Sequence, residues 1–63
     1  MDKQTVATAS GKILTARVAR VGTNHGYCGQ LVARNGRVVW EGDVLPFAAA
    51  AMDSAISSAS RMA

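Results

Sequence analysis

The stretch LVARNGRVVW, residues 31–40, decides the fold, because an Asn-Gly pair at 35–36 stands between two apolar runs. In this setting the pair is the strongest short-range signal of a two-residue hairpin turn, in which both turn residues adopt positive φ. The turn fixes which residues face each other across the two strands. The predicted pairs are Arg34 with Arg37, Ala33 with Val38, Val32 with Val39, and Leu31 with Trp40.

Strands are predicted on both sides of this turn and once more before it. β-Branched and apolar residues in partial alternation indicate strands over residues 12–21, 27–34 and 37–42. The segment GTNHG, residues 22–26, is a loop by composition. Because both connections are short, the three strands form an antiparallel meander in the order 1-2-3.

A helix follows the last strand. Residues 43–46 (DVLP) open it, since proline suits the first helical turn, and either Asp43 or Leu45 caps it. It runs from about Phe47 to Arg61. One apolar stripe at helical spacing consists of Ala48, Met52, Ala55, Ile56, Ala59 and Met62. The predicted fold class is therefore α+β, with the C-terminal helix packed on one face of the sheet (βββα).

The first ten residues are predicted to be a flexible N-terminal segment, and residues 11–63 a single domain. As an alternative, Thr5 to Ala9 turns back through Ser10-Gly11 and adds a short extra strand.

Alternation from the turn assigns one apolar face to the core. With a four-residue first loop, Val18 falls opposite Leu31 and lands on this same face without adjustment. The predicted core consists of Val18, Leu31, Ala33, Val38, Trp40, Phe47, Met52 and Ile56.

The opposite face is the candidate binding surface. Arg34 directly opposite Arg37 is locally unfavourable, so solvent and Glu41, or an anionic partner, must relieve the repulsion. Valines between arginines make the surface partly apolar and partly basic, as interfaces often are. The candidate partner- or anion-binding residues are Arg17, Arg34, Arg37, Val32, Val39, Gln30 and Glu41.

Composition points away from catalysis. The 63 residues include one cysteine and one histidine, and His25-x-x-Cys28 is interpreted as a loop histidine and a small strand residue. We expect no catalytic residue, no metal site and no cofactor. With three aromatic residues and many alanines the core is thin, which favours a homodimer. With neither a secretory signal nor a membrane span, a cytoplasmic location is expected.

The pattern Tyr27-x-x-x-Leu31-x-Ala33-x-Asn35-Gly36-x-Val38, followed by Phe47, Ala51 and Ile56, resembles the YegP-like βββα repeat. The resemblance covers roughly residues 27–58, and the first strand matches only in kind. The sequence departs from the family where residues 41–43 (EGD) and the longer run to Phe47 replace a Ser-x-x-Tyr approach to the helix. Since members commonly carry two tandem repeats, the resemblance implies that a single repeat dimerises. The family's role is not established, so no active site carries over.

Two functional hypotheses result. The first is a small non-enzymatic interaction protein that forms a homodimer through its exposed edge strands and its alanine/serine helix, and whose mixed basic face binds a protein or a small anionic ligand. On base rates alone, such chains are frequent among phage and mobile-element products that modulate a host factor. The second is a nucleic-acid-binding protein that uses the basic outer face of its sheet, in keeping with seven Lys/Arg against four Asp/Glu and a net charge of +3.

Overall fold

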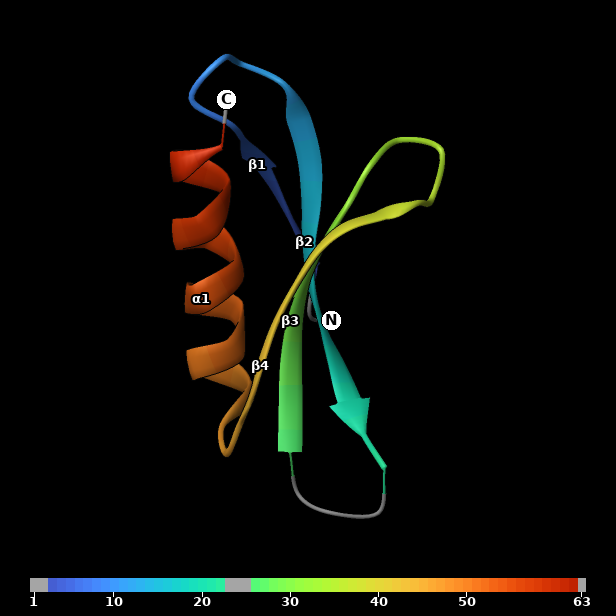
Figure 1. Cartoon of the computed structure of the whole chain (residues 1–63), viewed down its shortest axis with the longest axis vertical. Coiled ribbons are helices and arrows are strands. Elements are labelled where there is room, and N and C mark those ends of the chain that lie inside the picture. Colours follow the sequence, from blue (N-terminus) through green and yellow to red (C-terminus); the bar gives the residue numbers. More distant parts are fainter. Residues whose placement is uncertain (1–2, 23–25, 63) are drawn as a thin grey trace.

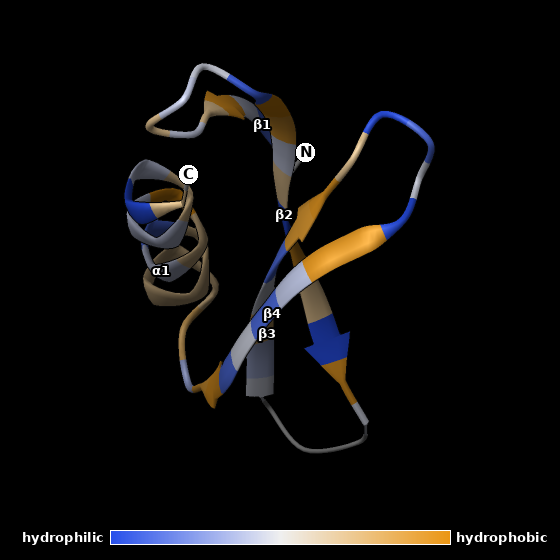
Figure 2. Cartoon of the chain, turned by 45° about the horizontal axis from the view of Figure 1, so that its top comes forward, coloured by the Kyte–Doolittle hydropathy of each residue, from blue (hydrophilic) through white to orange (hydrophobic). Residues whose placement is uncertain are grey.

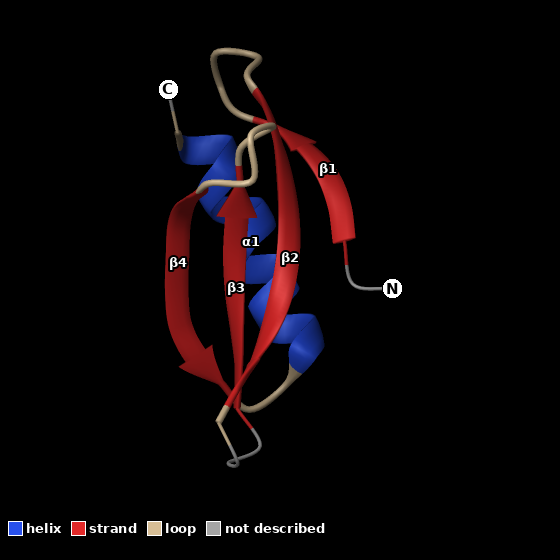
Figure 3. Ribbon diagram, turned by 90° about the vertical axis from the view of Figure 1, so that its right-hand side faces the viewer, coloured by secondary structure: helices blue, strands red, loops and turns tan. Residues whose placement is uncertain are grey.

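The structure, a computed structural model, describes residues 3–22 and 26–62. In these residues an antiparallel sheet is covered on one face by one helix (Figure 1). The elements are β1 (Lys3–Ala7), β2 (Ile13–Val21), β3 (Gly26–Val32), β4 (Val38–Leu45) and α1 (Ala48–Arg61). The sheet order is β1-β2-β3-β4, so each strand pairs with its neighbour along the chain and β1 and β4 form the edges (Figure 3).

The predicted α+β class, antiparallel sheet and C-terminal helix are confirmed, but the number of strands is wrong. β1 adds a fourth strand, which pairs with β2 so that Val6 faces Leu14. Val6 packs against the core and is the only residue of β1 that is not exposed. A strand with a single inward apolar side chain gives almost no alternation, which is why the sequence favoured a flexible segment.

The turn at Asn35-Gly36 has three residues and not two. The Ala33 N–H donates to the Arg37 carbonyl at 2.8 Å, and the Gly36 N–H donates to the Ala33 carbonyl at 2.9 Å. Gly36 has φ +88°, whereas no residue other than glycine has positive φ in the described ranges. This is a type I turn closed by a glycine bulge, and the predicted two-residue turn is wrong. The Asn35 side chain stabilises it by accepting the Arg37 N–H at 3.0 Å.

The longer turn changes the register next to it. Leu31 faces Trp40 as predicted, but Val32 faces Val38, and Val39 is an extra residue in β4. The predicted pairs Arg34–Arg37, Ala33–Val38 and Val32–Val39 are therefore wrong, since Ala33 bonds Arg37 and Val38 faces Val32. A second shift lies between Cys28 and Gln30, so β4 is irregular at two places.

The β2–β3 register also differs from the prediction, by two residues. Ala16 faces Leu31, and Val18 faces Gly29. A shift by two residues leaves every side chain on its predicted face, because side chains alternate with a period of two. The β2 side chains predicted to face the core therefore lie on the inner face, the one that α1 covers.

The core lies between α1 and the central strands. Leu31 and the helix residues Ala51, Ala55 and Ala59 are fully buried. At Gly29 the helix approaches so closely that an added Cβ would overlap the Ala51 carbonyl oxygen. Small residues on both elements thus bring the helix directly onto the β3 backbone.

Two of the predicted core residues are exposed. Val38 is 40% exposed because the extra residue in β4 turns it away from the helix. Phe47 is 69% exposed because it is the N-cap of α1 and not part of the buried stripe. The segment from Asp43 to Leu45 continues β4, so α1 begins at Ala48 without a side-chain cap. Partly buried residues that pack against the core include Ala33, Trp40, Met52 and Ile56, and Val18 is also partly buried.

Candidate functional site

The outer face of the sheet is the one that α1 leaves open (Figure 3). A row of hydrogen-bonded side chains crosses the middle of this face. Arg17 Nε donates to Gln30 Oε1 at 2.7 Å, and Gln30 Nε2 donates to Glu41 Oε2 at 2.8 Å. The row therefore runs from a cation on β2 to an anion on the edge strand β4. Because Gln30 both accepts and donates, it fixes the positions of the two charged side chains.

Exposed apolar side chains surround this row. The register places Ile13, Val21, Val38 and Val44 on the outer face. Their exposed fractions are 50%, 38%, 40% and 58%, in that order. These strand residues account for four of the six large apolar side chains that are exposed in the described residues. Figure 2 shows apolar stretches along β2 and at the start of β4.

Cys28 lies on the same face but is buried between the strands. Its Sγ donates to the Gly42 carbonyl at 3.1 Å. Burial, followed by the negative charge of Glu41, raises the pKa of the Cys28 thiol above its ordinary value. The thiol is therefore protonated at neutral pH and is a poor nucleophile. No group of three potential metal ligands lies within residues 3–22 and 26–62, and His25 falls outside the described residues.

The predicted binding residues do not form one patch. Arg17, Gln30 and Glu41 meet in the row, and Val32 is buried beside it. The other three predicted residues, Arg34, Arg37 and Val39, lie at the β3–β4 turn or next to it. The structure thus divides the predicted surface into a central row and a turn.

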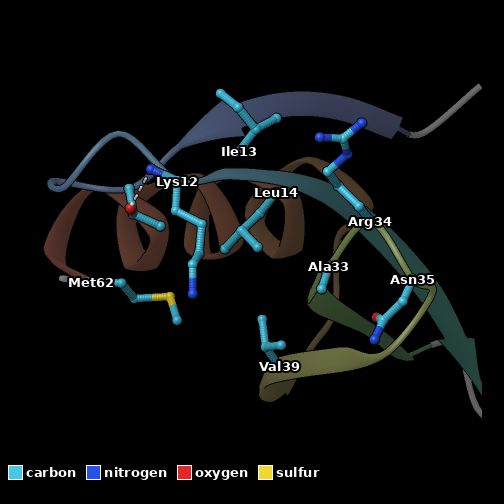
Figure 4. A pocket seen from close by; sticks show the side chains of 9 residues that line it. Lys12, Ile13, Leu14, Ala33, Arg34, Asn35, Val39 and Met62 are labelled. Atoms are coloured by element: carbon cyan, nitrogen blue, oxygen red, sulfur yellow. Dashed lines mark hydrogen bonds between the residues drawn. The ribbon is translucent and has the colours of Figure 1, made fainter.

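A cavity of about 560 Å³ lies at this turn, and its lining extends from Leu14 and Met62 to Ile13, whose side chain is on the outer face. Its boundaries are the β3–β4 turn, the β1–β2 turn and the end of α1 (Figure 4). The two turns have the same pattern of backbone hydrogen bonds. In the β1–β2 turn the Thr8 N–H donates to the Lys12 carbonyl and the Gly11 N–H donates to the Thr8 carbonyl, which matches the two bonds of the β3–β4 turn. The two turns diverge because the β1–β2 turn follows the helix, where the Ala9 N–H donates to the Met62 carbonyl at 2.8 Å, while the β3–β4 turn bends away (Figure 1).

This cavity was not predicted from the sequence, because it depends on how two turns diverge in space. The turn dipeptides Ser10-Gly11 and Asn35-Gly36 do mark the two turns that border the cavity, but of the basic residues that follow them only Lys12 lines it. Lys12 and Arg34 line the cavity. None of the acidic side chains in the described part of the chain lies along it.

No helix within the described residues is long and apolar enough to cross a membrane. Comparison with known proteins finds no matching family model, no matching curated protein and no matching solved structure. The resemblance of residues 27–58 to a YegP-like repeat therefore stays a prediction.

Proposed function

We propose that the chain is a non-enzymatic interaction protein that works as a homodimer, with the outer faces of two sheets packed against each other. The observation that carries this proposal is the position of Ile13, Val21, Val38 and Val44, all exposed on the face without a helix. Apolar side chains on an open sheet face gain stability when a second layer covers them. Two such faces pack at about 10 Å with their strands nearly aligned.

The charges of the central row support a twofold arrangement. Arg17 lies at one end of the row and Glu41 at the other. A twofold axis parallel to the strands and passing over Gln30 brings Arg17 of one copy opposite Glu41 of the second. The same axis sets Val44 of one copy opposite Ala19 of the second, since both residues share a row with Cys28.

Pairing through the strand edges is less favourable. β4 has two register irregularities and carries Glu41 and Asp43, and β1 is five residues long with Lys3 at its start. Bulges, charges and short length are the features by which edge strands avoid pairing with another chain.

Sedimentation equilibrium at micromolar concentration tests the dimer. We expect twice the monomer mass for the natural sequence and a monomer for Val44→Lys, because the substitution places a charge in the interface. Ser57→Lys is the matched control, since Ser57 is exposed on α1, and it is expected to leave the mass unchanged. A monomeric natural chain would refute the proposal.

A charge-swap experiment tests the arrangement of the two copies. Arg17→Glu and Glu41→Arg each place like charges opposite each other in their own homodimer, so each variant alone is expected to dimerise more weakly. Mixing the two variants restores both opposite-charge pairs, so a heterodimer is expected on mixing. Failure of the mixture to associate better than either variant would rule out this axis.

The nucleic-acid hypothesis predicts a different result. It requires cations along the outer face, whereas Glu41 shares the central row with Arg17, and Arg34 and Arg37 lie at the turn. A salt-dependent shift of duplex DNA that Arg34→Ala/Arg37→Ala weakens would favour it over the dimer proposal.

A further inference from the structure

The cavity between the two turns combines an apolar interior with cationic side chains. Figure 4 shows Lys12, Leu14, Val39 and Met62 arranged around a common space. A volume of about 560 Å³ falls within the range of small-molecule pockets. Leu14 is 3% exposed, so the inner end of the cavity reaches the core.

The polar atoms around the cavity are mainly hydrogen-bond donors. The side-chain oxygen of Asn35 accepts the Arg37 N–H, and the Asn35 amide nitrogen adds N–H donors at the edge of the cavity. The Thr8 hydroxyl oxygen accepts the Lys12 N–H at 3.1 Å and is within 3.1 Å of the Ser10 hydroxyl. Lys12, which Figure 4 shows pointing into the common space, adds a donor that carries positive charge. A ligand that matches this set bears a negative charge and accepts hydrogen bonds.

We infer that this cavity binds a small amphipathic carboxylate, a molecule with an apolar chain and one terminal carboxylate. The apolar chain lies against Leu14, Val39 and Met62, and the carboxylate pairs with the ammonium group of Lys12. An inorganic anion would leave the apolar interior uncovered, and a neutral apolar molecule would leave the donors without a partner. The position of Val39 is essential, because the extra residue in β4 is what brings this side chain to the cavity.

Titration with decanoate, followed by ¹H–¹⁵N NMR, tests the inference. We expect saturable shifts of the Lys12, Ala33, Val39 and Met62 amides, with 1-decanol binding at least tenfold more weakly because it has the same chain but no charge. Equal binding of decanol and decanoate would overturn the assignment of the carboxylate to a cation. Chemical-shift changes confined to amides of the outer face would show that decanoate does not bind in the cavity.

A matched pair of variants isolates the role of Lys12. Lys12→Gln is expected to weaken decanoate binding at least tenfold, and Lys3→Gln, which removes the same charge from the exposed start of β1, is expected to leave it within twofold. If both variants lost the same decanoate affinity, the effect would come from net charge alone, and the proposed binding site would be refuted. Because Val44 does not line the cavity, Val44→Lys tests the dimer without changing the binding site, and the two proposals can fail separately.

Discussion

The two faces of the sheet differ in packing and in exposure to solvent. The inner face is packed with small residues, and at Gly29 the helix backbone lies directly on the strand. The outer face carries valines and an isoleucine that are 38–58% exposed around one hydrogen-bonded row. Stability therefore depends mainly on close contact on the inner face, whereas the outer face is available for a partner. Substitutions on the inner face should therefore affect folding, and substitutions on the outer face should affect association.

Gly29→Ala is expected to have the largest effect on stability. The new methyl group would overlap the Ala51 carbonyl oxygen, so the helix must move away from β3. Overpacking of this kind costs about 1–3 kcal/mol and more when backbone must shift, so we expect a loss of about 3 kcal/mol. Urea unfolding followed by Trp40 fluorescence measures it. A loss below about 1 kcal/mol would mean that the helix is not held close to the sheet.

Gly36→Ala is expected to have an intermediate effect. The site is open, with no atom within 4 Å of an added Cβ, so the cost comes only from the φ of +88°. A non-glycine residue in this region costs about 1–2 kcal/mol. Gly11→Ala should cost a similar amount, because the first turn has the same geometry and φ is +89°. Arg37→Ala, in the same turn, is the control and should stay within about 0.5 kcal/mol.

Val44→Lys should change the stability of the isolated chain by less than about 0.5 kcal/mol, since the side chain is 58% exposed. Unfolding must be measured below the concentration at which the chain associates, so that loss of the dimer does not contribute. A loss above about 1 kcal/mol would show that the outer face also holds the fold together, and the contrast between the faces would disappear.

The smallest effect at neutral pH concerns Cys28, whose folded-state pKa is raised by burial and then by Glu41. The unfolded thiol ionises first, near its ordinary pKa of about 8.5. The free energy of unfolding is therefore unaffected below that pH and falls as the pH rises toward the folded-state pKa. Cys28→Ala removes this contribution, so the free energy of unfolding of the natural sequence and of the variant is measured between pH 7 and pH 10. If the two free energies change in parallel with pH, the thiol does not make this contribution.

The sequence was sufficient to predict an antiparallel sheet of neighbouring strands with a C-terminal helix on one face, because these depend on alternation and on helical spacing, but the prediction lacked β1. Leu31 opposite Trp40 was predicted by counting from a two-residue turn, and it is confirmed because the third turn residue and the extra residue Val39 offset each other. The β2–β3 register differs from the prediction by two residues, but the predicted faces of the β2 side chains are correct, because a shift of two keeps each side chain on its face.

What the sequence could not predict depends on single-residue irregularities. The glycine bulge at Gly36 and the extra residue Val39 moved Val38 to the outer face and separated Arg34 from Arg37. The two-residue and three-residue turns both accept Asn-Gly, so the pair alone does not distinguish them. The cavity was missed for the same reason, because it requires the positions of two turns relative to the helix.

The order of the strands has a consequence for the speed of folding. Every strand pairs with its neighbour in sequence, so each hairpin can form from local contacts, and only the docking of α1 brings distant parts of the chain together. Local contacts lower the entropy that must be lost before the transition state is reached. We expect hairpin formation within about 1–10 μs, followed by a slower step in which the helix closes over Gly29. The close approach of helix and strand would then set the rate of folding as well as the stability.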